Sequence, residues 1–149
     1  MVSIHRVKQT DEAFRSLILQ LDEELAAQYG ELQIQYGAHN QTDGLLLAVV
    51  ALADGDPAAC GAIRDHGDGE VEIKRMYVSP EFRRQGLARR VLGELERAAH
   101  ELGYVRAVLE TGVKQSAAIA LYQGLGYQFI ENYGPYVGNA NSVCMGKML

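Results

Sequence analysis

Hydrophobic and polar positions change their spacing along the chain, and this change separates predicted strands from predicted helices. Alternating or unbroken apolar runs, bounded by turns rich in glycine, aspartate and proline, predict β-strands. The central runs follow one another through the short segments ADGDP and HGDG, which predicts an antiparallel meander. The predicted strands are residues 2–8, 45–53, 59–65, 70–78, 105–110, 127–131 and 142–149.

Apolar residues recur at helical spacing in three further segments. The first predicted helix spans Phe14 to Leu25, and either Thr10 or Asp11 can cap it. The other two helices are residues 86–102, with one continuous apolar stripe, and residues 116–125, with Ser116 as the cap.

The order of these elements predicts a mixed α/β fold. The long helix at 86–102 lies between two strands, and such a crossover predicts at least one parallel strand pair. Residues 31–44 are polar and contain several glycines, so we expect a loop or a short broken helix there.

Composition narrows the class of protein. A chain of 149 residues with 48% hydrophobic and 22% charged residues is typical of one globular domain, which we expect to span residues 1–149. The net charge of -5 argues against a nucleic-acid partner held by whole-domain charge. The sequence has no signal-like N-terminus and no apolar run long enough to span a bilayer, so we expect a cytoplasmic protein without a membrane partner. Cys60 and Cys144 show no metal-binding spacing, and we expect no metal.

One segment departs from the acidic background. FRRQGLARR, residues 82–90, places four arginines around Gly86 between a predicted strand and the start of the long helix. The N–H groups at a helix start are unpaired and carry the positive end of the helix dipole, so this junction suits a phosphate group. The spacing matches neither a Walker loop nor GxGxxG, and solvated arginines beside a turn are the alternative interpretation.

Two motifs resemble a known family. EIKRMYVSPEFRRQGLARRVL, residues 72–92, resembles the acetyl-CoA signature of the GNAT N-acetyltransferases, with Arg83, Gly86 and Ala88 in its three defining places. LETGVKQSAAIALYQGLGY, residues 109–127, is similar to the fifth strand and fourth helix of that family. The resemblance implies a small, bacterial-type, single-domain member. Its fold would be a mostly antiparallel sheet with a central splayed parallel strand pair, flanked by helices.

The resemblance also implies acetyl-CoA as cosubstrate and a set of residues that hold it. The backbone of the strand before the arginine segment would pair with the pantetheine arm, and the loop amides would hold the pyrophosphate. Gln115 stands where many members carry asparagine, which keeps an amide on a longer side chain. The implied cofactor-binding residues are Met76, Tyr77, Val78, Arg83, Arg84, Gln85, Gly86, Leu87, Ala88, Arg89 and Gln115.

Acetyl transfer requires proton transfers, and three residues are candidates for them. An attacking amine must be neutral, yet an alkylamine with a pKa of ~10.4 is protonated at neutral pH, so a base or water must take its proton. Glu72 is the first candidate because the family often places a base on that strand, and Glu110 is the second. Tyr122 matches the tyrosine that protonates the departing thiolate in many members. Exposed strand carboxylates and a packed core tyrosine are the structural alternatives.

The acceptor is the least specified part of the prediction. Aromatic residues mixed with polar ones, Tyr36, Tyr133 and Tyr136, are candidates to line a pocket for a small-molecule amine. The sequence therefore predicts an enzyme that acetylates a primary amine by direct attack. Two alternatives stay open, namely a non-catalytic acyl-CoA-binding or regulatory module and an acetyltransferase acting on protein N-termini or lysines. A homodimer is an expectation from family analogy alone.

Overall fold

The computed structural model describes residues 1–29 and 44–149. The predicted segment 31–44 lies outside these residues except for Gly44. In chain order the elements are β1 (Val2–Val7), α1 (Glu12–Tyr29), β2 (Leu45–Ala53), β3 (Asp56–Gly67), β4 (Glu70–Val78), the short helix η2 (Pro80–Phe82), α3 (Leu87–Glu101), β5 (Arg106–Gly112), α4 (Ser116–Gly124), β6 (Gln128–Ile130), the short helix η3 (Gly134–Tyr136) and β7 (Ser142–Met148).

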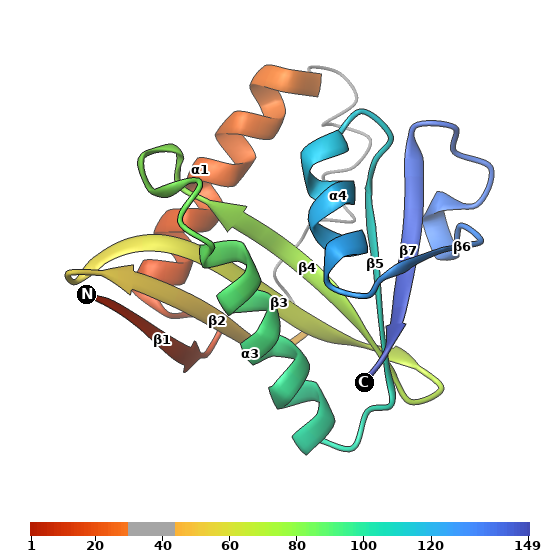
Figure 1. Cartoon of the computed structure of the whole chain (residues 1–149), viewed down its shortest axis with the longest axis horizontal. Coiled ribbons are helices and arrows are strands. Elements are labelled where there is room, and N and C mark those ends of the chain that lie inside the picture. Colours follow the sequence, from red (N-terminus) through yellow and green to blue (C-terminus); the bar gives the residue numbers. More distant parts are fainter. Residues whose placement is uncertain (30–43) are drawn as a thin grey trace.

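The strands form one mixed sheet, as the sequence predicted. Its order is β1-β2-β3-β4-β5-β7-β6, and every neighbouring pair is antiparallel except β4 and β5. The helix α3 connects these two strands, so the predicted crossover and its parallel pair are confirmed. Figure 1 shows β4 and β5 adjacent near their starts and diverging toward the end that faces α1 and α4.

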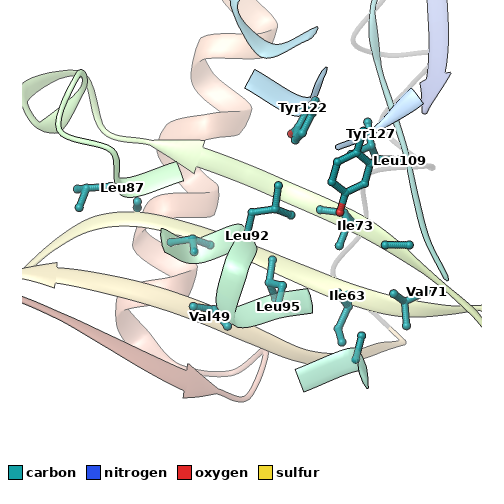
Figure 2. Packing of buried hydrophobic residues seen from close by; sticks show 14 of the residues in the cluster. Val49, Ile63, Val71, Ile73, Leu87, Leu92, Leu95, Leu109, Tyr122 and Tyr127 are labelled. Carbon is teal, nitrogen blue, oxygen red and sulfur yellow. The ribbon is translucent and has the colours of Figure 1, made fainter. Parts of the chain in front are cut away.

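Helices cover both faces of the sheet. On one face α3 and α4 pack on the strands through an apolar cluster that includes Leu92, Leu95 and Tyr122, and Figure 2 shows these side chains over Ile63, Ile73 and Leu109. On the other face α1 packs through a second cluster around Phe14 and Leu17. The residues described contain no helix that is both long and apolar enough to cross a bilayer.

The central strand pair is short because β4 contains an irregularity. β4 and β5 pair at Glu70 with Arg106, Val71 with Ala107 and Glu72 with Val108. The register of β4 with β3 then shifts near Arg75, whose φ of 60° is unusual for a residue with a side chain. The bulge turns the second half of β4 away from β5, so the backbone of β4 beyond Glu72 faces a gap.

Gly61 on β3 lies opposite this bulge and permits close packing. A Cβ atom there would clash with the Met76 sulfur and would lie 2.8 Å from Leu95 Cδ1. The absence of a side chain therefore lets α3 approach the sheet beside the bulge.

The predicted N-terminal cap is confirmed for α1 and is wrong for α4. The Asp11 carboxylate accepts a hydrogen bond from the Phe14 N–H at 3.0 Å, so Asp11 caps α1 as expected. The expected cap at Ser116 is wrong, because Ser116 is already helical and Gln115 occupies the cap position without a side-chain capping bond. The Gln115 N–H donates instead to the Gly112 carbonyl, and this turn leads β5 into α4.

Candidate active site

A cavity of about 710 Å³ fills the gap between β4 and β5. Residues of α1 and α4 both line this cavity, and the two helices cover opposite faces of the sheet. The cavity therefore extends through the sheet where β4 and β5 diverge. The sequence-predicted residues that line it are Glu72, Met76, Tyr77, Val78, Arg83, Ala88, Glu110, Gln115, Tyr122 and Tyr136.

A smaller hollow of about 230 Å³ lies beside it at the start of α3. The two cavities share Val78, Arg83 and Ala88 among their lining residues, so they are adjacent along the end of β4. The smaller one adds the predicted residues Arg84, Gly86, Leu87 and Arg89. The exposed Gln85 lines neither cavity.

The backbone at the start of α3 leaves several donors available. The Arg90 N–H donates to the Gly86 carbonyl at 3.2 Å, and this is the first hydrogen bond within the helix. The N–H groups of Leu87, Ala88 and Arg89 come before it and have no acceptor inside the helix. Gly86 has φ 76°, in the left-handed region, and a Cβ added there would meet no protein atom within 4 Å. The backbone conformation therefore favours glycine at this position, and the space in front of these donors is open to an anion.

Arg83 is held by the protein itself. Its Nε donates to the Val78 carbonyl at 2.9 Å, and its Nη2 forms an ion pair with Glu24 of α1 at 2.9 Å. The remaining side-chain positive charge at the helix start comes from Arg84, Arg89 and Arg90, which are all exposed. Arg83 thus joins the loop to α1.

One face of α1 makes further polar contacts with the segments around the cavity. The Ser79 hydroxyl donates to Gln20 at 3.0 Å, and the Gln115 amide donates to Gln28 at 3.3 Å. Together with Glu24, which also accepts from the Tyr77 hydroxyl at 3.2 Å, these contacts fix α1 against β4, the arginine loop and the start of α4.

Glu72 is buried and surrounded by polar partners. Its Oε2 accepts a hydrogen bond of 2.7 Å from the Tyr133 hydroxyl, and its Oε1 lies 3.3 Å from Arg64 Nε and 4.0 Å from Lys74 Nζ. The residue is 4% exposed. Burial of a carboxylate is tolerated when charges and hydrogen bonds compensate it, and these three partners supply that compensation.

Glu110 has a different environment on the opposite wall. The Ser142 hydroxyl donates to its Oε2 at 2.7 Å. Burial raises the pKa of Glu110, the Ser142 bond and the Lys74 charge lower it, and the charge of Glu72 raises it, with a net shift upward. A carboxylate with a raised pKa binds a proton more strongly than an ordinary one.

Tyr122 projects from α4 to the same cavity. The residue is 7% exposed, and burial, followed by the charge of Glu110, raises its pKa to about 12. The phenol therefore keeps its proton at neutral pH. One wall of the cavity thus carries a proton acceptor and another carries a proton donor, an arrangement suited to general acid–base chemistry.

The tyrosines predicted to line the pocket for the amine differ in their positions relative to the cavity. Tyr136 is buried and lines the cavity, whereas Tyr133 lies behind Glu72 and packs edge to face on His66, with centroids 4.5 Å apart. Burial raises the pKa of both phenols, and the charges of Glu72 and Glu110 add to the shift for Tyr136. Tyr36 lies outside the residues that the structure describes.

Three site residues were not anticipated from the sequence. Lys74 lies beside Glu72 in the cavity wall, Ser142 holds Glu110, and Glu24 connects α1 to Arg83. Lys74 carried a usable signal, because residues 72 and 74 of a strand project to the same face. The other two come from distant segments and gave no local pattern.

The two thiols are poorly suited to nucleophilic chemistry. Cys60 and Cys144 are both buried, and burial raises the pKa of Cys60 to about 12 and that of Cys144 above its usual range. Reactive cysteines need a lowered pKa and access. Neither thiol lines the main cavity.

Comparisons with known proteins agree with this geometry. The sequence profile of the acetyltransferase (GNAT) family matches residues 9–127. An IAA acetyltransferase of Azospirillum brasilense is 35% identical over 146 residues, which are 93% of this chain and 95% of that protein.

Solved structures are also similar over the whole chain. A protein of Klebsiella pneumoniae described as an acyl-CoA N-acyltransferase has a TM-score of 0.83 and 33% identity, with 100% of this chain and 98% of that chain covered. PaiA N-acetyltransferase of Thermoplasma acidophilum, solved in complex with coenzyme A, has a TM-score of 0.77 at 15% identity, with 100% and 99% covered. At that identity the likeness concerns the fold.

Proposed function

The chain belongs to the acetyltransferase (GNAT) family, and we propose that it transfers the acetyl group of acetyl-CoA to the primary amine of a small molecule in the cytoplasm, by direct attack on the thioester. One observation carries this proposal. The gap between β4 and β5 connects the donor-rich start of α3 to a cavity that Glu110 and Tyr122 both line. Acetyl-CoA supplies an activated acyl group, and the chain supplies binding and proton transfer.

The backbone around the gap fits acetyl-CoA. Beyond Glu72, β4 pairs with β3 but not with β5, so its backbone offers partners to the amides of the pantetheine arm along Met76 to Val78. The N–H groups of residues 87–89 and the charges of Arg84 and Arg89 suit the pyrophosphate. The coenzyme A bound to a protein of the same fold supports this assignment.

Glu110 is the base that the contacts favour, although family position favours Glu72. Glu72 is engaged by Tyr133 and Arg64, and a proton acceptor must have an available lone pair directed at the amine. Glu110 lines the cavity, accepts a hydrogen bond from Ser142 through one of its two oxygens, and has a raised pKa. An acceptor whose pKa is raised toward neutrality removes the amine proton more effectively.

Tyr122 completes the chemistry as the acid. Its phenol stays protonated at neutral pH and lines the cavity on the α4 side. Donation of that proton to the departing sulfur releases coenzyme A as a neutral thiol. Direct transfer needs no covalent intermediate, in agreement with the buried state of Cys60 and Cys144.

The experiment is thiol release from acetyl-CoA across a panel of polyamines, amino acids, aminoglycosides and peptides with a free N-terminus. We expect release that depends on one class of small amine, with a mass increase of one acetyl group in that amine. Turnover on peptides alone would support the protein-acetylating alternative. Tight acetyl-CoA binding without turnover on any amine would support the non-catalytic module instead.

A further inference from the structure

A buried lysine lies beside Glu72 in the wall of the same cavity that Glu110 lines. Lys74 is 8% exposed, lines the cavity and places its Nζ 4.0 Å from Glu72 Oε1. Lysine ammonium groups are strongly hydrated, and burying one costs free energy unless negative charge compensates it. The position of this lysine therefore requires an explanation.

Strand geometry explains which groups share the site. Val71 and Ile73 of β4 pack in the cluster under α3, so Glu72 and Lys74 project to the opposite face. The ladder ends at the pair of Glu72 with Val108, and two residues further along each strand Lys74 and Glu110 line the cavity between them. Ala107 and Leu109 of β5 face α3, so Glu110 shares the face of Lys74.

We propose that Lys74 is a positioning residue of the transfer reaction, because its ammonium is the counter-charge that Glu72 and Glu110 share and it keeps Glu110 able to accept the amine proton at neutral pH. This inference rests on the proposed function. Two carboxylates in one buried site would otherwise retain a proton between them, since like charges in a desolvated site disfavour double ionisation.

The charges around these groups agree with this role. Lys74 is acted on by Glu72 and Glu110, which favour its charged form, and by Arg64 of β3 and Arg75 of β4, which oppose it. Burial is the largest influence and lowers the pKa of Lys74. Glu110 in turn accepts a hydrogen bond from the Ser142 hydroxyl and is acted on by the charges of Lys74 and Glu72, and its own charge acts on Tyr122, Tyr136 and Cys144.

The test is the pH dependence of kcat/KM in Lys74→Met. Removal of the counter-charge should move the acidic limb to higher pH by about one unit or more. Lys74→Arg should keep the limb near that of the parent protein, and the double variant Lys74→Met/Glu72→Gln should return it toward the parent, because it also removes the competing negative charge. Lys8→Met, which removes an exposed lysine just after β1, is the matched control and should not move the limb. If Lys74→Met is too unstable to titrate, Lys74→Gln is measured in its place.

A second measurement does not depend on turnover. The ¹³C signal of the Glu110 side-chain carboxyl, identified by its loss in Glu110→Gln, should titrate at higher pH in Lys74→Met than in the parent protein. An unchanged titration, an unmoved acidic limb, or a double variant that stays as displaced as the single one would overturn the proposal. A parent protein that acetylates no amine would refute the proposed function, while the carboxyl titration would still decide the role of Lys74.

Discussion

The rings of Tyr122 and Tyr127 meet edge to face, with centroids 5.7 Å apart, yet only Tyr122 lines the cavity. The Tyr127 hydroxyl donates instead to Glu96 of α3 at 2.8 Å, and this bond fastens α3 to the segment that follows α4. Two neighbouring phenols therefore have separable roles, which makes them a matched pair for mutation.

Tyr122→Phe should lower kcat by about 10²-fold or more while the Kd for acetyl-CoA stays near that of the parent, because only the proton donor is lost. Tyr127→Phe should keep kcat and lower the free energy of unfolding by about 1 kcal/mol. Steady-state kinetics, calorimetric titration and urea denaturation measure the three quantities. Equal kcat values in Tyr122→Phe and the parent would remove Tyr122 from the chemistry.

Gly86→Ala should weaken acetyl-CoA binding by about 10-fold or more, because a residue with a Cβ resists φ 76° and shifts the N–H groups at the start of α3. Gly55, with φ 88° in the turn between β2 and β3, supplies the control. Both alanine variants should lose about 1 kcal/mol of stability, but Gly55→Ala should bind acetyl-CoA normally. A normal Kd in Gly86→Ala would argue against a phosphate site there.

Glu110→Gln should change how stability depends on pH. The folded state raises the pKa of Glu110, so it binds that proton more tightly than the unfolded state does. This contribution is fully present below the ordinary value of 4.5 and is lost as the pH rises through the folded pKa. Glu110→Gln has no carboxyl group to lose this proton. As the pH rises from 4 to 7, the free energy of unfolding of the variant should therefore increase relative to that of the parent protein.

Ser142→Ala provides the opposite change at the same carboxylate. The Ser142 hydroxyl donates to Glu110 and lowers its pKa, so its removal should make the decline in stability with pH steeper than in the parent. Urea denaturation at pH 4, 5, 6 and 7 gives both comparisons. Parallel curves for the parent and both variants would show that Glu110 is not perturbed by its surroundings.

Gly61→Ala should destabilise the fold by about 1–3 kcal/mol, because its Cβ would lie within 2.8 Å of Met76 and Leu95. Gly93 lies inside α3, where an added Cβ would meet no atom within 4 Å, so Gly93→Ala should instead gain about 0.5–1 kcal/mol. Thermal and urea denaturation of the two variants test this difference in sign. A neutral Gly61→Ala would mean that α3 can move away from the bulge without cost.

Local patterns in the sequence were enough to predict most of the fold. The strands at 45–53 and 70–78 agree with β2 and β4 to the residue, because alternation and turn residues act over short distances. The start of α3 at Leu87 was also predictable, since Gly86 and the change of period mark it. The cap at Ser116 was not, because the turn at Gly112 determines where α4 begins.

The contacts inside the site could not be predicted in the same way. Tyr133 and Glu72 are 61 positions apart in sequence, and Arg83 and Glu24 are 59 apart. Such pairs form only when loops and helices pack around the finished sheet. The sequence therefore pointed to Glu72, Glu110 and Tyr122, which line the cavity, but not to Lys74 beside them or to which carboxylate is already engaged.

The short pairing of β4 with β5 has a consequence for how the molecule opens. Among the residues described, the ladder between β1–β4 and the group β5, β7 and β6 consists of the pairs from Glu70 with Arg106 to Glu72 with Val108. The two groups of strands should therefore exchange their amide protons as separate units in the free protein, each with its own opening free energy. A ligand lying in the gap would link these units, and amide exchange would slow on both sides of it at once.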